Sequence, residues 1–106
     1  MGIVVIVAYK PKPGKEDGLR AELNDHVPIL RGQNLATERP TLVLRARDGT
    51  LLEVFEWQSL EAINQAHTNP TVLAMWKRFG EVCDFRPLAS LEECQGPFAG
   101  FEPVTL

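Results

Sequence analysis

Residues 53–79 read EVFEWQSLEAINQAHTNPTVLAMWKRF, and this segment decides how the rest of the chain is interpreted. Leu51 to Trp57 is rich in aromatic and β-branched residues, which predicts a strand. Ser59 stands directly before an apolar series, where a helix N-cap belongs, so a short helix should follow and end at His67. Asn69-Pro70 is a second start signal, with asparagine as the cap and proline as the first helical residue. The apolar series of the short helix consists of Leu60, Ile63 and His67.

The composition describes one soluble globular domain. The chain has 106 residues, of which 44% are hydrophobic and 24% charged, with a net charge of −3. Its lysines and arginines form no basic stripe, so we expect no nucleic-acid partner. The apolar run at residues 3–8 is far shorter than the about 20 residues that span a bilayer, and it lacks the features of a signal peptide. We expect a cytoplasmic protein with no membrane partner, in which Cys83 and Cys94 are free thiols.

The first half of the chain predicts a strand followed by a helix. Ile3 to Tyr9 is a continuous apolar run that ends at a loop with two prolines, which is typical of a central strand covered on both faces. Lys15 to Arg31 has helical periodicity, and Pro28 should kink this helix or change its character. The predicted buried face of the helix consists of Leu19, Leu23, Val27 and Leu30.

Three further strands follow from turn signals. Thr41 to Arg47 and Thr50 to Trp57 flank Asp48-Gly49, and an Asp-Gly pair between such runs indicates a hairpin. Arg45 and Glu56 on these strands should each need a partner. Residues 84–89 predict a fourth strand, at an edge or bulged, because Pro87 lacks a ladder donor.

The order of elements is strand, helix, strand, strand, helix pair, strand. This is the ferredoxin-like βαββαβ arrangement, an α+β fold with an antiparallel sheet and helices on one face. The bare face of such a sheet must be covered, and pairing two sheets in a homodimer would cover it. We assign residues 1–91 to this domain and 92–106 to an extended tail. The tail should dock through Phe98 and Phe101, on its own subunit or across an interface.

The same residues resemble the antibiotic biosynthesis monooxygenase family. The resemblance covers roughly residues 3–90 and includes the Lys-Pro-Gly-Lys segment at 12–15. It implies a dimeric α+β barrel with a pocket between helices and sheet in each subunit. Some members of the family oxidise polycyclic aromatic or quinol-like substrates with dioxygen and no cofactor, others degrade heme, and many have no assigned activity. The matching positions are Glu56, Trp57, Ser59, Glu61, Ala62, Ala66, His67, Asn69, Pro70, Trp76 and Phe79.

The heme-degrading branch of that family does not match. It places a tryptophan nine residues after the shared tryptophan and a histidine nineteen residues after it. In this sequence those positions are Ala66 and Trp76, and the first strand contains no asparagine. Heme degradation by that set of residues is therefore not expected.

His67 is the main catalytic candidate. Cofactor-free oxygenation requires a base that deprotonates a phenol or enol, and an imidazole with a reference pKa of about 6.5 suits that role. The alternative is that His67 ends its helix and donates to a backbone carbonyl. His26 is a possible second base, although a half-exposed helix histidine is the more common interpretation.

Five other residues are candidates for substrate binding. Trp57, Trp76 and Phe79 could form aromatic walls for a flat molecule, or pack in the core. Tyr9 could orient a substrate hydroxyl, or be a strand-end aromatic. Arg45 could hold an anionic group, or form an ion pair, as could the arginine at position 86.

The hypotheses for function belong to different classes. No cluster of histidines and cysteines indicates a metal, and no glycine-rich loop indicates a phosphate, so we expect no cofactor. The first hypothesis is a cofactor-independent monooxygenase acting on an aromatic or quinol-type molecule. The second is a non-catalytic homodimer that binds a small molecule or is associated with stress. The third is a subunit whose fold serves only to dimerise.

Overall fold

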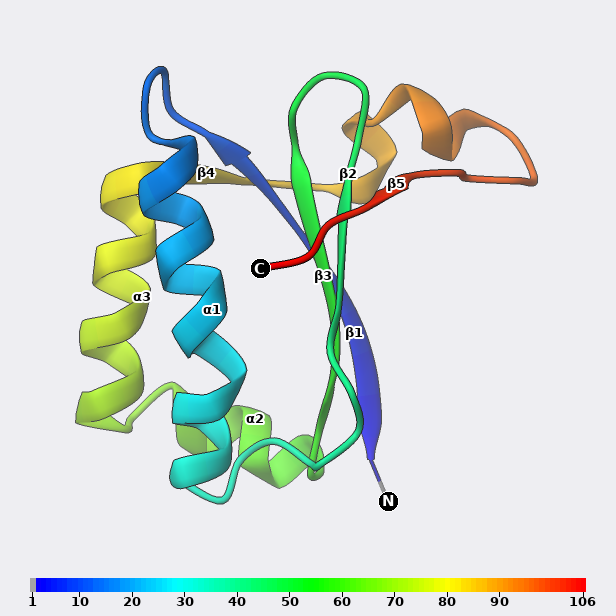
Figure 1. The fold of residues 1–106 in the computed structure, drawn as a ribbon. Coiled ribbons are helices and arrows are strands. Elements are labelled where there is room, and N and C mark those ends of the chain that lie inside the picture. Colours follow the sequence, from blue (N-terminus) through cyan, green and yellow to red (C-terminus); the bar gives the residue numbers. More distant parts are fainter. Residues whose placement is uncertain (1) are drawn as a thin grey trace.

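A computed structural model describes residues 2–106 and contains a five-stranded antiparallel sheet with helices on one side (Figure 1). The spatial order of the strands is β4-β1-β3-β2-β5. The elements are β1 (Ile3–Pro11), α1 (Glu16–Gly32), β2 (Leu42–Arg45), β3 (Leu51–Trp57), α2 (Leu60–Ala66), α3 (Pro70–Val82), β4 (Cys83–Arg86), the 3-10 helices η1 (Leu88–Ser90) and η2 (Glu92–Gln95), and β5 (Glu102–Pro103).

The ferredoxin-like fold predicted from the sequence is confirmed. The first four strands have the order β4-β1-β3-β2, and β5 is added at the free edge of β2. The hairpin between β2 and β3 turns at Asp48-Gly49, where Gly49 has a φ of 92°, a conformation that favours glycine. Both charged residues on these strands have partners, as expected: Arg45 lies 3.1 Å from Glu16, and Glu56 lies 3.0 Å from Arg39.

Helices α1 and α3 cover one face of the sheet (Figure 1). The four apolar residues predicted to form the buried face of α1 are all at most 2% exposed. Pro28, which was expected to kink the helix or change its character, does not interrupt it, because α1 continues to Gly32. Pro28 is exposed, so water can satisfy the carbonyl that its missing N–H leaves without a partner.

Both predicted helix starts in residues 53–79 are confirmed. The Ser59 hydroxyl accepts a hydrogen bond from Ala62 N at 3.0 Å, and the Asn69 side chain accepts from Thr71 N and Val72 N. The predicted apolar face of α2 is wrong at Leu60, which is 64% exposed. Alanines at positions 62 and 66 are buried instead, because the cap geometry turns that side of the helix toward the core.

The other face of the sheet is covered over one half only. Phe101 and the 3-10 helices pack on it, around a small cluster that includes Ala8, Leu52 and Leu91. The expectation that β1 is covered on both faces is therefore wrong for its first half, where Val4 is 52% and Ile6 50% exposed.

The segment after β4 differs from the prediction of a strand over residues 84–89. The strand ends at Arg86, because Pro87 cannot donate to a ladder and its carbonyl accepts from the Ser90 backbone N–H instead. Leu88 and Ala89 thus belong to η1, which leads the chain onto the half-covered face.

Candidate functional site

A small cavity lies between the two long helices and the sheet, and its wall is almost entirely apolar. Its volume is about 190 Å³. Phe85 on the edge strand is 55% exposed, so the cavity opens beside this residue. The lining residues come from five elements and are Val5, Val7, Tyr9, His26, Phe55, Trp57, Trp76 and Phe85.

Three polar side chains meet beneath this cavity. Glu53, at the middle of β3, is 0% exposed. Its Oε1 accepts a hydrogen bond from the Tyr9 hydroxyl at 2.8 Å and lies 2.7 Å from Nδ1 of His26. Tyr9 and His26 are themselves only 2% and 3% exposed. A buried tyrosine–carboxylate–histidine cluster of this kind is costly to build, so it points to a functional site.

The contact with Glu53 indicates which nitrogen of His26 is left as an acceptor. A carboxylate accepts hydrogen bonds, so beside a carboxylate at Glu53 the Nδ1 of His26 is the donor. In the neutral imidazole, Nε2 then holds a lone pair. Nε2 is buried and has no hydrogen-bond partner within residues 2–106. The ring is held by edge contacts with Phe55 and Phe79, at centroid distances of 5.3 and 5.0 Å.

The electrostatics of the cluster keep the Tyr9 hydroxyl protonated. Burial raises the pKa of Tyr9 well above its ordinary value of 10.0, and the neighbouring Glu53 carboxylate raises it further. The Tyr9 hydroxyl is therefore a fixed donor to Glu53. Nearby, burial also raises the pKa of the Cys83 thiol, from 9.0 to about 11.

Alkaline pH should destabilise the fold through these two groups. Both pKa values are higher in the folded state, so their contribution to stability is complete below about pH 9 and is lost as pH rises toward and beyond 11. Tyr9→Phe removes one of the two titrating groups, and its free energy of unfolding should fall less steeply between pH 9 and 11 than that of the wild type. Urea unfolding at several pH values measures this, with Cys83→Ala as the matched single change. Parallel pH dependences for wild type and Tyr9→Phe would contradict the assignment.

Four of the residues singled out from the sequence line the cavity, and one of them is His26, the possible second base. Tyr9, Trp57 and Trp76 come from β1, β3 and α3, and all three contribute to its wall. Phe79 does not line it, although it is 0% exposed and stacks on Tyr9 at a centroid distance of 5.2 Å. Phe79 supports the cavity from the core side.

His67 and Arg45 lie elsewhere. His67 is exposed at the end of α2, where its Nδ1 is 2.8 Å from the Ile63 carbonyl, the backbone contact considered as its alternative role. Its ring contacts the edge of Trp76 at 5.3 Å. Arg45 pairs with Glu16 at 3.1 Å and Glu102 at 3.9 Å, away from the cavity.

Two residues of the cluster were not recognised from the sequence. A half-exposed position was favoured for His26, which is 3% exposed, and Glu53 was not singled out, although it is 0% exposed. A signal for both was present. His26 lies three residues after Leu23 and four before Leu30, on the buried stripe of α1. Glu53 shares a strand face with the buried Phe55 and is the one acid on that face of β3.

The other polar features of residues 2–106 offer no comparable site. No group of three or more histidine, cysteine, aspartate and glutamate side chains in this part of the chain is placed to hold a metal ion. Both cysteines are free, as expected. None of the helices in the same range is long and apolar enough to cross a membrane.

The fold defines a small α+β protein with a ferredoxin-like antiparallel sheet and an apolar cavity on its helical side. The chain is similar to a solved structure described as Rv0793 from Mycobacterium tuberculosis, with a TM-score of 0.63 and 24% sequence identity. The match covers 82% of this chain and 87% of that one, and at this identity it establishes the fold. No protein-family model matches the sequence, and no curated protein is significantly similar to it.

Proposed function

We propose that the protein is a cofactor-independent monooxygenase of a small aromatic or quinol-type molecule, with His26 as the general base. The observation that carries this proposal is the buried His26, which lines the apolar cavity and whose Nε2 has no hydrogen-bond partner within residues 2–106. Glu53 holds Nδ1 of His26 at 2.7 Å, which leaves Nε2 available to act as the base.

The chemistry needs only the base, the substrate and dioxygen. Nε2 of His26 removes a proton from an acidic carbon or from a phenol in conjugation with it, and the carbanion form gives its electron pair to dioxygen. A carbon–oxygen bond forms, and the peroxide takes a proton back from the imidazolium. Loss of water then converts a CH₂ group into a carbonyl, so CH₂ and O₂ become C=O and H₂O. Glu53 stabilises the imidazolium between these steps, as carboxylates do beside catalytic histidines.

The cavity supports a compact, flat substrate. A closed apolar cavity of roughly 150 Å³ holds benzene, and this one measures about 190 Å³. Trp57 and Trp76 supply flat apolar surface for stacking on a ring. Apolar walls also exclude water, which would otherwise protonate the carbanion. We therefore propose a substrate of one ring or little more, with one acidic group placed against His26.

His67 has a different place in this proposal. It contacts the edge of Trp76 from outside, so we assign it a positioning role for that wall of the cavity. His67 as the base remains the alternative, and the experiment below separates the two histidines.

We also infer that two copies of the chain associate and that the protein is cytoplasmic. Val4, Ile6 and Leu42 are 50–52% exposed on the uncovered half of the sheet, and a second copy would bury them. Free thiols at both cysteines are typical of reducing compartments.

The base can be tested without the oxygen step. Under anaerobic conditions in D₂O, the wild type should catalyse hydrogen–deuterium exchange at the acidic C–H position of members of a panel of single-ring phenols and ketones. His26→Asn retains an amide donor near the position of Nδ1 but lacks Nε2, so exchange should fall about 10²- to 10⁴-fold. Oxygen uptake in air should fall by the same factor if proton removal limits the rate. His67→Asn is the matched control and should retain exchange within a few-fold.

Each result decides between the hypotheses. Exchange that falls with His67→Asn and not with His26→Asn would move the base to His67. Binding of the panel by wild type, detected by thermal shift, without exchange or oxygen uptake would favour the non-catalytic binding protein. Thermal unfolding of each variant checks that the fold is intact.

A further inference from the structure

The half-covered face of the sheet has two unlike halves. Residues 88–103 form a raised shoulder over one half, and Figure 1 shows this shoulder standing on the side of the sheet opposite the helices. The other half is a bare apolar patch formed by Val4, Ile6, Leu42 and the partly buried Val54. The strand register places these residues side by side, since Val54 pairs with both Ile6 and Leu42.

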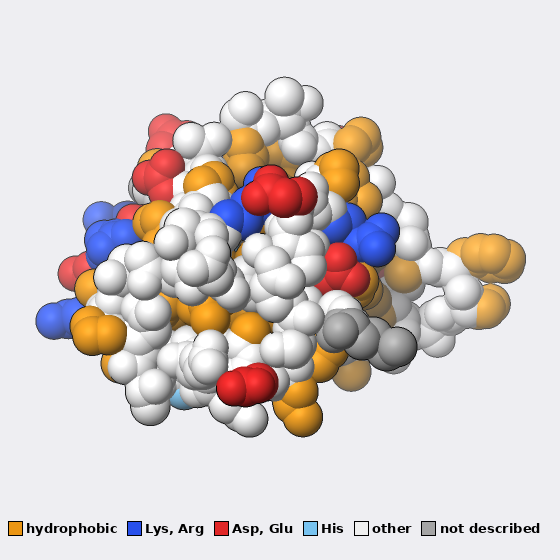
Figure 2. Space-filling view, turned by 90° about the horizontal axis from the view of Figure 1, so that it is seen from below, with side chains coloured by type: hydrophobic (Ala, Val, Ile, Leu, Met, Phe, Trp, Pro, Cys, Tyr) orange, Lys and Arg blue, Asp and Glu red, His pale blue; other side chains and the backbone are white. Residues whose placement is uncertain are grey.

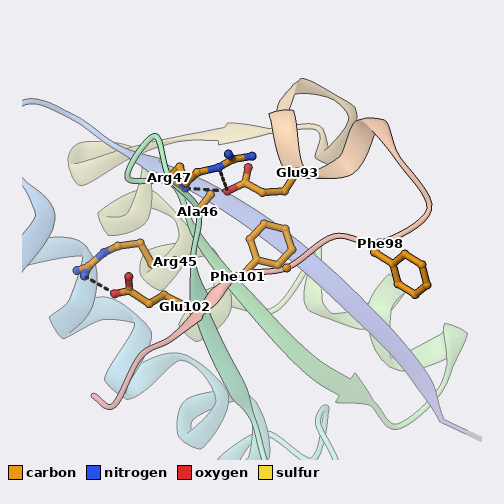
Figure 3. Close-up of a pocket in the computed structure, with 8 residues that line it drawn as sticks. Arg45, Ala46, Arg47, Glu93, Phe98, Phe101 and Glu102 are labelled. Atoms are coloured by element: carbon orange, nitrogen blue, oxygen red, sulfur yellow. Dashed lines mark hydrogen bonds and ion pairs between the residues drawn. The ribbon is translucent and has the colours of Figure 1, made fainter.

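Within the shoulder, residues 96–100 form a projecting arm that carries an exposed aromatic side chain. All five residues are exposed, and Phe98 is 92% exposed. Figure 3 shows Phe101 turned toward Ala46 and the sheet, whereas Phe98 lies on the outer bend and points away from it. In the view from below, hydrophobic side chains of the molecule project beyond its body at this end (Figure 2).

The arm is held in this projecting position from both sides. Before it, the Gln95 side chain donates to the carbonyls of Ala89 and Leu91, at 2.7 and 3.1 Å. After it, β5 pairs with β2, and Val104 N donates to Val43 O at 2.8 Å. Phe98 therefore lies on a loop that is anchored at both ends, and not on a free chain end.

The hollow beneath the arm does not account for the exposed position of Phe98. It has a volume of about 470 Å³ and contains two arginines. Both arginines are already paired: Arg47 lies 3.6 Å from Glu93, and Arg45 lies 3.9 Å from Glu102 (Figure 3). Arg45 also lies 3.1 Å from Glu16. The hollow therefore lacks an unpaired positive charge that would attract an anion, and it leaves the outward side of Phe98 uncovered.

We propose that the arm of each chain docks Phe98 on the bare patch of a second copy of this chain. The inference rests on the proposed homodimer and specifies how it is built. The two-fold axis of this dimer runs parallel to the sheet, crosses the strands at right angles and lies between the two halves of the face. Rotation about it places each shoulder over the bare half of the partner. The opposite arrangement, with patch on patch, would bring the two raised shoulders together and hold the sheets apart. The chain is thus complementary to itself, because every copy supplies one arm and one patch, as a two-fold interface requires.

Sedimentation equilibrium on the full chain tests the role of the arm. Phe98→Ser should raise the dimer dissociation constant at least about 100-fold, because each dimer loses two buried phenyl groups. Ile6→Thr keeps a β-branched residue in the strand and should also weaken the dimer. Leu60→Ser changes another exposed apolar residue, on α2 and 64% exposed, and should leave the constant unchanged. Phe98 makes no core contact, so its loss should not unfold the monomer.

A cross-linking experiment tests the arrangement itself, in chains that also carry Cys94→Ala. Phe98→Cys mixed with Ile6→Cys should form an intermolecular disulfide on mild oxidation, whereas neither variant should cross-link with itself. Cys83 is 2% exposed and does not interfere. A dimer that survives Phe98→Ser unchanged, or self-linking of Phe98→Cys, would overturn the docking and leave the homodimer standing. A wild type that stays monomeric at high concentration would overturn both the docking of Phe98 and the homodimer. The proposed role of His26 would still be tested separately by the exchange assay.

Discussion

Phe79→Ala is expected to lower the free energy of unfolding by about 3–5 kcal/mol, the cost of removing a large aromatic side chain from a packed core. Phe79 is 0% exposed, and its ring stacks on Tyr9 at 5.2 Å and meets the edge of His26 at 5.0 Å. A domain of this size has a total stability of about 5–15 kcal/mol, so this one change removes a large share of it. Urea or thermal unfolding measures the loss.

Phe79→Ala should also lower the exchange activity of the candidate site. Without Phe79, Tyr9 and His26 lose the surface that holds their rings, so the exchange rate should fall even at temperatures where the variant is folded. Leu73→Ala, on the same helix but 44% exposed, is the control and should cost much less. A loss below about 1 kcal/mol for Phe79→Ala would mean that the core closes around the deletion.

Glu53→Ala is expected to be comparably severe, at about 3–5 kcal/mol, for an electrostatic reason. It removes the acceptor of the Tyr9 hydroxyl at 2.8 Å and of the His26 Nδ1–H at 2.7 Å. Two donors in a dry interior then have no partner, and each costs about 1–3 kcal/mol. Denaturant unfolding at neutral pH measures the loss.

Glu53→Gln separates the role of the acceptor from the role of the charge. Its carbonyl oxygen can still accept from both donors, and its amide nitrogen replaces Oε2, which has no partner within residues 2–106. Glu53→Gln should therefore retain more than half of the stability that Glu53→Ala loses. Its exchange activity should nevertheless fall, because a neutral amide stabilises the imidazolium less than a carboxylate does. Equal losses of stability in the two variants would argue against the hydrogen-bonded cluster.

The order of elements, and with it the fold, followed from local signals in the sequence. Ser59 and Asn69-Pro70 mark helix starts through hydrogen bonds to residues two or three positions away, which any isolated segment can make. Asp48-Gly49 likewise marks its hairpin through a backbone conformation that glycine adopts without strain. Predictions failed where tertiary packing decides which side of a helix is buried. Leu60 was predicted to face the core, but α2 packs against the core with a different side.

The cluster beneath the cavity could not be located in the same way. His26 lies 27 positions and Tyr9 44 positions before Glu53 in the chain. The three residues meet only because α1 packs on the paired strands β1 and β3. Local periodicity places each of them on a core-facing stripe, but it does not say which polar group on one stripe meets which on another.

The sequence by itself thus determined the class of fold and the two capped helices, because these depend on residues close together in the chain. The tertiary structure alone decided that His26 is buried with a free nitrogen and that His67 is exposed. It also decided that Phe101 docks on its own sheet while Phe98 projects into solvent. Burial and hydrogen-bond pairing are properties of the packed whole, since a side chain loses its water only when segments distant in sequence close around it.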